Sequence, residues 1–425
     1  DNQDLSTSLE ECEVSLSRVV VATNRRPVLD GLSARFATTL DLDGVCDDAD
    51  ADDGGLYWGF ATLATPAALL RKSSSATLKE HTHVSGSASP KTPPSPRLRE
   101  PDTVADVQFV GWAPASRERC LEALAAADDD CLTYVHGFNT NLQFAARTAH
   151  FYGVKFRRPV FCFAWPSNPP LPKTWAISAV LSVAERNYTA AEQMMQRSVA
   201  ALVAVATQVR KTVRGRLLWK AHSMGCYLTL NAIDRVLQRL RGCTDAADDD
   251  DAALVSEHQR APPIVFDSRR KKKAPSSQSS LTAGLSGLFG RVVLDAPDAP
   301  TWFFVDTLTR AARHDVRFLH LFNAKDEAVE ISRQRRGLDF PAPGNGFVTP
   351  NVLGVQVVDC SAAKGCSIGS HDYGRRDNLV LDDQRGFFDG LNPEHRHLAP
   401  HPRFAAAGLW LLPAASSASA DAPPS

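Results

Sequence analysis

The pentapeptide AHSMG at residues 221–225 constrains the fold of this chain more than any other stretch. An apolar run at 217–219 leads into it, and apolar residues at helical spacing follow it as far as Leu240. A strand, a small-x-Ser-x-small turn and a helix together form a nucleophile elbow, which raises the serine hydroxyl above the carboxyl end of the strand. The turn is so sharp that its flanking residues must be small. The alternative is an ordinary strand-to-helix turn that contains a serine. Motifs elsewhere in the chain are needed to choose between the two interpretations.

Elsewhere the chain alternates short apolar runs with helix-like stretches. We predict strands at 17–23, 57–63, 104–112, 132–135, 159–164, 217–219, 291–294, 316–322 and 355–358. The strand at 355–358 is expected to be the last. We predict helices at 117–127, 142–152, 184–209, 228–240 and 302–313, and a short helix that ends at 332. This alternation is typical of an α/β fold with a mostly parallel central sheet and helices on both faces. Ligands bind such sheets at the carboxyl ends of the strands.

Two polar low-complexity stretches interrupt the pattern. Residues 72–100 are rich in Ser, Pro, Lys and Thr, and residues 242–288 contain an acidic and a basic run. Segments with so few apolar residues cannot offset the entropy lost on ordering, so both are predicted to be disordered inserts. Because both lie between strong core elements, we expect a single domain over 17–412, followed by a disordered tail at 414–425.

The charge balance argues against polyanionic partners. The chain has 47 Lys and Arg against 48 Asp and Glu, a formal net charge of −1, so no long-range field favours nucleic acid or an anionic membrane. A nuclear signal or an anion patch at the basic run 269–273 is an alternative to a solvated loop. No stretch reaches the roughly 18 apolar residues of a membrane span.

Nine cysteines are scattered along the sequence without a CxxC pair, which gives no support to a zinc or thioredoxin-like site. Several lie in apolar runs, so we interpret them as buried thiols of a reducing compartment, which favours a cytoplasmic location. Because the chain begins at Asp1 and not at Met, a targeting segment ahead of it stays an alternative. No glycine-rich phosphate loop, nucleotide fingerprint or metal cluster is recognisable, so we expect no cofactor.

A serine hydroxyl is a weak nucleophile and needs an adjacent histidine, which a carboxylate orients. Where the serine lies on an elbow, the acid and then the histidine follow it along the chain. The second strand after Ser223 ends at Asp326, which we predict to be the acid, although a helix N-terminal Asp is the alternative. Asp298 is the reserve acid, and Asp295 is expected to fix a turn. His371 follows the last predicted strand and is the predicted base. Three later histidines are its alternatives: His395, His397 and His401.

The oxyanion of a tetrahedral intermediate needs preorganised N–H donors. One comes from the residue after the nucleophile, Met224, and the other from the loop after an early strand, here Phe138. Gly137 at this bend lets the backbone approach a ligand closely. We expect His136 to brace this loop and His222 to face away from the serine.

Six stretches resemble those of one known family: VATNR at 21–25, YVHGFN at 134–139, FAWPS at 163–167, AHSMG at 221–225, LDAPD at 294–298 and NAKDEA at 323–328. They resemble the α/β-hydrolase family of unknown function called DUF900, and the likeness covers most of residues 17–375. It implies an α/β-hydrolase fold with Ser223 as nucleophile, Asp326 as acid and His371 as base, and it implies no substrate. The chain departs from the family after His371. An aromatic residue usually follows the histidine closely, whereas here Asp372 stands before Tyr373.

These features predict a serine hydrolase that cleaves a carboxylic ester of a small molecule, as esterases and lipases do. An amidase or peptidase would use the same triad, and a binding or scaffold protein that has lost catalysis is a further alternative. Residues 168–184 are the candidate lid. Four of its apolar residues are candidates for an acyl pocket, with the core as the alternative: Trp175, Ile177, Val180 and Leu181.

Overall fold

The structure, a computed structural model, describes residues 14–25, 27–30, 33–36, 56–66, 101–167, 177–245, 284–337, 342–346, 354–363, 371–396, 398–402, 404 and 408–412. The predicted insert at 72–100 and the predicted tail at 414–425 lie outside these residues. Of the predicted insert at 242–288, residues 246–283 also lie outside them. Both ends of that stretch are helical, because α5 (Met224–Asp245) and α6 (Leu285–Leu288) reach into it.

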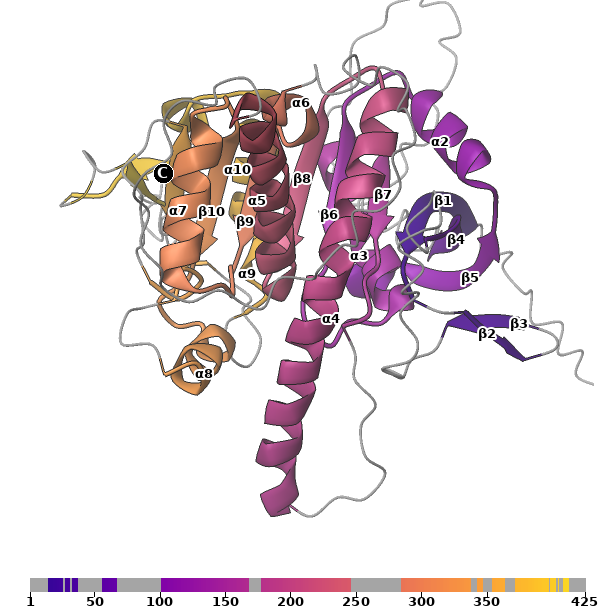
Figure 1. The fold of residues 1–425 in the computed structure, drawn as a ribbon, viewed down its shortest axis with the longest axis horizontal. Coiled ribbons are helices and arrows are strands. Elements are labelled where there is room, and N and C mark those ends of the chain that lie inside the picture. The colour runs from indigo at the N-terminus through magenta and orange to yellow at the C-terminus, as the bar shows by residue number, and fades with distance from the viewer. Residues whose placement is uncertain are drawn as a thin grey trace, which may run out of the picture.

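An eleven-stranded sheet forms the centre of the fold (Figure 1). Its strands are β1 (Val14–Thr23), β4 (Tyr57–Pro66), β5 (Gln108–Pro114), β6 (Cys131–Val135), β7 (Val160–Phe163), β8 (Leu217–His222), β9 (Arg291–Asp295), β10 (Arg317–Phe322), β11 (Val355–Asp359), β12 (Ala399–Pro400) and β13 (Leu409–Leu411). Their order across the sheet is β12-β13-β11-β10-β9-β8-β6-β7-β1-β4-β5. All neighbours from β13 to β1 pair in parallel, and the edge strands β4, β5 and β12 pair antiparallel. The predicted mostly parallel sheet is therefore confirmed. A separate hairpin consists of β2 (Pro27–Asp30) and β3 (Ser33–Phe36).

Helices cover both faces of the sheet. One face carries α2 (Arg117–Ala125), α4 (Ile177–Thr212), α5, α6 and α7 (Thr301–Ala312), and Figure 1 shows α4, α5 and α7 in front of the strands. The other face carries α3 (Leu142–Phe156) and α10 (Asn378–Asp389). Two shorter helices, α8 (Glu327–Arg335) and α9 (Tyr373–Arg376), come after the carboxyl ends of β10 and β11. This arrangement brings the residues that follow the parallel strands to one edge of the molecule.

The two faces bury separate apolar cores because successive side chains of a strand point to opposite sides. In β8, Leu217 and Trp219 belong to the core under α4 and α5, whereas Leu218 belongs to the other core. Every residue of β6 and β7 is buried, as is typical of parallel strands that are covered on both sides. The strands that end at the site are thus held rigidly from both faces.

The structure differs from the sequence-based prediction at the start of the strand before residue 112 and after the strand at 355–359. Val104–Asp106 forms a short 3-10 helix, η2, and not the start of a strand, because Thr103 N–H donates to the Asp106 carboxylate at 2.7 Å and Asp106 N–H donates back to Thr103 O at 3.1 Å. The strand at 355–359 is not the last one. After it come α10, a 3-10 turn η4 (Pro393–Arg396) and β12, and then β13 pairs in parallel with β11.

The helix α4 begins earlier than predicted and has 36 residues. It includes the second half of the candidate lid, whose first half, 168–176, lies outside the described residues. Despite its length, α4 lacks an apolar stretch able to cross a membrane, and so does every other helix in the described part of the chain.

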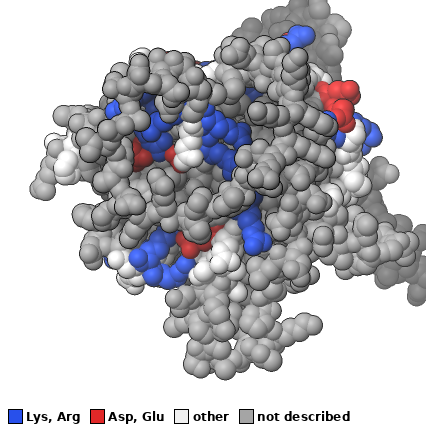
Figure 2. All heavy atoms as spheres, viewed as in Figure 1, with Lys and Arg blue, Asp and Glu red and all other residues white. Residues whose placement is uncertain are grey.

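Surface charges on this side of the molecule are mixed. Blue and red spheres lie against each other over the region of α5 and α7 in Figure 2. In that region Arg310 of α7 pairs with Asp234 of α5 at 2.6 Å and with Asp306 at 2.7 Å. Such surface pairs contribute about 1 kcal/mol or less each, so they matter more for solubility than for stability.

Candidate active site

Ser223 occupies the turn between β8 and α5 in a strained backbone conformation. Its φ is 54°, in the left-handed region that residues with side chains seldom adopt. Three backbone hydrogen bonds hold it there: Ser223 N–H donates to Asp295 O at 2.9 Å, and Ser223 O accepts from Cys226 N–H at 2.9 Å and from Asp298 N–H at 3.3 Å. The strain therefore sits at the residue whose hydroxyl must be presented, as is common at functional sites.

Two glycines allow this turn to pack against the loop that follows β6. A Cβ atom at Gly225 would lie 2.4 Å from the carbonyl oxygen of His136, and one at Gly137 would lie 2.9 Å from Ser223 Cβ. Neither distance is possible between real atoms. The small residues of the pentapeptide thus have a steric cause, which is the close approach of α5 to the His136–Phe138 segment.

Asp326 and His371 are hydrogen-bonded to each other, with 2.8 Å between His371 Nδ1 and Asp326 Oδ2. The other carboxylate oxygen, Oδ1, accepts the N–H of Val329 at 3.1 Å and caps α8. The two interpretations of Asp326 from the sequence are therefore compatible, because each uses one oxygen. Of the alternative histidines, His395 is exposed and His401 contacts Phe404. The third, His397, lies outside the described residues.

The environment of this pair sets its protonation. Burial alone lowers the pKa of His371, but the hydrogen bond to Asp326 and its negative charge outweigh burial and raise the pKa above 6.5. Burial raises the pKa of Asp326, an effect that the hydrogen bond to His371 partly opposes. With Nδ1–H donated to the carboxylate, the neutral ring carries its free lone pair on Nε2, the atom a general base needs.

His222 does not face away as expected. It lines the same pocket, and its Nε2–H donates to the backbone oxygen of His371 at 3.1 Å, with the two ring centroids 4.7 Å apart. Room for the ring exists because Gly137 lacks a side chain, whose Cβ would lie 3.1 Å from His222 Nδ1. Burial, and then the nearby His371, lower the pKa of His222 to about 4, so it is neutral at pH 7. A neutral donor thus holds the backbone of His371.

The two predicted oxyanion donors come from different elements, Met224 from α5 and Phe138 from the loop after β6. Met224 is the first residue of α5, so its N–H has no intrahelical acceptor. In the described part of the chain, neither Met224 N–H nor Phe138 N–H donates a hydrogen bond to the protein. The loop of Phe138 is fixed by Asn139 N–H, which donates to Ser167 O at 2.9 Å, and by Thr140 N–H, which donates to Ser167 Oγ at 3.0 Å.

His136 braces this loop, as the sequence suggested. Its Nδ1 lies 2.9 Å from Gly137 O, and its ring stacks on Trp165 with centroids 5.5 Å apart. Trp165 Nε1–H in turn donates to His136 O at 2.7 Å. Burial, and then the charge of Arg25, lower the pKa of His136 to about 3, so this ring stays neutral.

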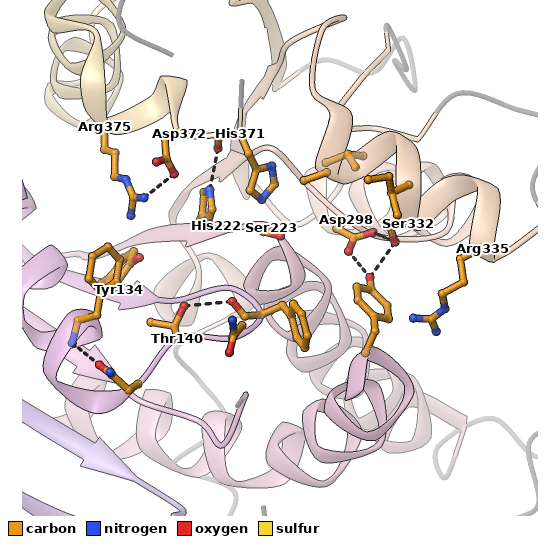
Figure 3. Close-up of a pocket in the computed structure, with 18 residues that line it drawn as sticks. Tyr134, Thr140, His222, Ser223, Asp298, Ser332, Arg335, His371, Asp372 and Arg375 are labelled. Atoms are coloured by element: carbon orange, nitrogen blue, oxygen red, sulfur yellow. Dashed lines mark hydrogen bonds and ion pairs between the residues drawn. The ribbon is translucent and has the colours of Figure 1, made fainter. Parts of the chain in front are cut away.

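Ser223, His371 and Phe138 line a pocket of about 910 Å³ (Figure 3). In Figure 3, Ser223 and His371 lie between two groups of side chains, with Tyr134, Asp372 and Arg375 on one side and Asp298, Ser332 and Arg335 on the other. Among the described residues, Ser223 Oγ makes no hydrogen bond to the His371 ring. Catalytic hydrogen bonds are often long in unliganded enzymes and tighten only with substrate.

Asp298, the reserve acid, belongs to the pocket wall. Its carboxylate accepts Ser332 Oγ–H at 2.7 Å and an Arg336 N–H at 2.6 Å, and it also accepts the hydroxyl of Tyr188. This network links α4 to α8 and leaves Asp298 engaged away from His371. The structure thus joins His371 to Asp326 and not to Asp298.

Asp295 forms a buried ion pair and does not simply fix a turn. Lys220 Nζ lies 2.7 Å from Asp295 Oδ2, and both side chains are almost fully buried. The pair joins β8 to β9 directly beneath Ser223, whose N–H binds the backbone oxygen of the same Asp295. A lysine inside an apolar strand and an aspartate at the end of the next strand were the sequence signal for it.

Metal-ligating side chains do not gather in groups of three or more in the parts of the chain described. Sequence reasoning missed several residues that line the pocket from helices, namely Tyr188, Ser332, Arg335 and Arg375. They carry no local motif, and only the folded arrangement brings them together.

The comparisons with known proteins identify a family. The family model described as alpha/beta hydrolase of unknown function, DUF900, matches residues 114–339. This range includes Phe138, Ser223 and Asp326 and ends before His371. No curated protein and no solved structure matches the chain. Since the matched range covers more than half of the 425 residues, the chain belongs to the DUF900 family of alpha/beta hydrolases.

Proposed function

We propose that this protein is a serine hydrolase that cleaves carboxylic esters. Ser223 Oγ attacks the ester carbonyl while His371 Nε2 takes its proton, and Asp326 keeps the resulting imidazolium in place. The N–H groups of Phe138 and Met224 bind the oxyanion. The imidazolium then protonates the departing alcohol, which leaves an acyl group on Ser223. Water, deprotonated by His371, releases the acid and restores the serine.

One observation carries the proposal. His371, whose ring is 2.8 Å from the Asp326 carboxylate, lines the same pocket as a serine with a φ of 54°. A serine in this backbone conformation, in one pocket with a histidine whose pKa a carboxylate raises, supplies the groups that activate a hydroxyl when a bound substrate brings them within hydrogen-bond reach.

The pocket suits an organic ester. Apolar and aromatic side chains supply much of its lining, including Phe138, Phe144, Tyr188, Val329 and Ile331. A volume of about 910 Å³ lies within the usual range for small-molecule sites. An acyl chain of moderate length therefore fits, which supports an esterase of small molecules.

Hydrolysis of p-nitrophenyl esters from acetate to laurate tests the proposal, with the matching p-nitroanilides measured in parallel. The purified protein is expected to hydrolyse at least some esters with burst kinetics, and Ser223→Ala is expected to lose this activity while it unfolds at the same urea concentration. Preferential cleavage of the anilides would indicate an amidase. A folded protein that turns over neither series and forms no acyl-enzyme would fit a scaffold and refute catalysis.

A further inference from the structure

One end of the pocket presents polar groups that the proposed chemistry does not use. Tyr134, at the end of β6, is 2% exposed and lines the pocket. Its ring packs against Tyr152 with centroids 5.4 Å apart, and among the described residues its hydroxyl has no hydrogen-bond partner. Burial raises the pKa of Tyr134, so the hydroxyl keeps its proton and can donate. A buried side chain thus turns an unused donor towards the pocket.

Arg375 lies at the same end, on the same side of Ser223 as Tyr134 in Figure 3. Its Nη2–H donates to Asp372 Oδ1, and its guanidinium lies 5.1 Å above the ring centre of Phe144. In the described part of the chain, no protein group accepts a hydrogen bond from Nε or Nη1. The aromatic ring and the carboxylate hold the guanidinium in place while two of its nitrogens stay available.

This end of the pocket has an excess of positive charge. Asp372 is shared by two arginines, since Arg376 Nη2 lies 3.2 Å from its second oxygen, Oδ2. Burial alone raises the pKa of Asp372, but the charge and hydrogen bond of Arg375, with smaller effects of His222 and Arg376, outweigh burial and lower the pKa to about 2, so the carboxylate stays charged. Because Asp372 is shared with Arg376, it neutralises Arg375 only in part.

The helix α3 adds to this potential. It has 15 residues, and its N-cap Asn141 and first-turn Phe144 both line the pocket. The N-terminal end of a helix carries a partial positive charge that stabilises anions. The nearby carboxylates of Asp326 and Asp295 oppose it little, because each is paired, Asp326 with His371 and Asp295 with Lys220.

We propose that the substrate carries an anionic oxygen group, such as a carboxylate, which Arg375 and Tyr134 bind while the ester bond lies at Ser223. This inference rests on the proposed ester hydrolysis and names its substrate class. Charge-assisted hydrogen bonds from arginine to a carboxylate are the strongest that a pocket of this kind can offer. Asp372 then has the task of orienting Arg375.

Two matched pairs of esters test the inference. In the first pair, the p-nitrophenyl monoester of glutaric acid carries a carboxylate in its acyl part, and its neutral counterpart has an isopropyl group in place of that carboxylate. In the second pair, acetoxybenzoate carries a carboxylate in its alcohol part, and its neutral counterpart is the methyl ester. After subtraction of the uncatalysed rate, kcat/KM of the native protein is expected to favour the anionic ester by roughly tenfold or more in at least one pair.

The variants Arg375→Met and Tyr134→Phe are expected to reduce this ratio, with Arg375→Met bringing it close to one. Arg376→Met is the matched control, because Arg376 pairs with the same carboxylate but does not line the pocket. Since it removes only a partly exposed charge and no donor that lines the pocket, it is expected to reduce the ratio much less than Arg375→Met does. No preference for the anionic ester in either pair, or an unchanged ratio in Arg375→Met, would overturn the inference.

A binding measurement separates this inference from the proposed function. Calorimetric titration of the Ser223→Ala protein with glutaric acid monomethyl ester is expected to show binding that is lost in Ser223→Ala/Arg375→Met. If no ester is hydrolysed but this difference is present, the anion site stands and ester hydrolysis fails. If esters are hydrolysed without any charge preference or any such difference in binding, the anion site fails and ester hydrolysis stands.

Discussion

Asp326 uses its two oxygens for different tasks, one to cap α8 and one to bind His371. The variant Asp326→Asn keeps an oxygen for the cap but removes the negative charge. Because this charge and hydrogen bond raise the pKa of His371, while burial lowers it, the pKa of His371 should fall in the variant. The base acts unprotonated, so the acid limb of kcat/KM should lie at lower pH in the variant than in the native protein.

The same variant should also lower kcat by about a thousandfold or more, since the histidine loses its orientation. A pH profile of ester hydrolysis measures both effects. Asp298→Asn is the comparison, because its carboxylate binds Arg336 and Ser332 and not His371. It should leave the acid limb in place. An acid limb that stays put in Asp326→Asn would count against the assigned pair.

His222 is predicted to be a positioning residue through its hydrogen bond to the backbone of His371. Replacement by Leu removes this donor, and replacement by Gln can keep it. We expect kcat of His222→Leu to fall by about five- to tenfold with little change in KM, since a neutral hydrogen bond contributes about 1 kcal/mol. His222→Gln should recover most of the loss. Equal losses in both variants, or a loss confined to KM, would show that the ring acts by packing alone.

The elbow depends on one close approach between elements, that of α5 to the loop after β6. In Gly225→Ala the new Cβ would lie 2.4 Å from His136 O, so α5 must shift and move Ser223 with it. We expect a loss of about 2 kcal/mol or more in the free energy of unfolding and a loss of most hydrolysis. Gly111→Ala is the control, because nothing lies within 4 Å of its added Cβ. Urea titration and ester assays should separate the two variants clearly.

The strands and turns that could be predicted from the sequence are those with a local sequence pattern. The strands around β6 to β11 follow from buried apolar runs, and the turn at Ser223 follows from its small neighbours. The order acid, then histidine, was enough to select Asp326 and His371, which the structure joins. By contrast, β12 and β13 have two and three residues, too few to show a period of alternation, so β11 was wrongly taken as the last strand.

The pocket walls could not be predicted because they depend on contacts between distant residues. Tyr188 and Asp298 are 110 residues apart, and Tyr188 and Ser332 are 144 residues apart. Tyr188 sits within the regular pattern of a long helix, and nothing in its neighbourhood marks it as a pocket residue. His222 was expected to face away because the room left by Gly137 is visible only in the folded molecule.

For the molecule as a whole, the ion pair of Lys220 and Asp295 couples the stability of the sheet to the site. Lys220→Met would leave Asp295 buried without its partner, which should lower the free energy of unfolding by about 3–5 kcal/mol. The double variant Lys220→Met/Asp295→Asn removes the charge as well, so it should be clearly more stable than Lys220→Met. Urea unfolding measures both. If the double variant loses as much free energy of unfolding as Lys220→Met and Asp295→Asn lose together, this account of the pair is contradicted.

The candidate site includes residues that lie beyond the range matched by the family model. The match ends at residue 339, and the remaining chain supplies β11, His371 and Arg375. The proposed base and the proposed anion site therefore rest on the folded geometry, which brings this part of the chain against Ser223.

Labelling with a fluorophosphonate, followed by peptide mass spectrometry, tests most directly whether Asp326 and His371 make Ser223 a nucleophile. The folded protein should gain one label, on Ser223, and Ser223→Ala should gain none. The labelling rate should fall by about a thousandfold in His371→Ala and also strongly in Asp326→Asn. Folded protein that stays unlabelled, or that is labelled equally fast without His371, would contradict the assignment.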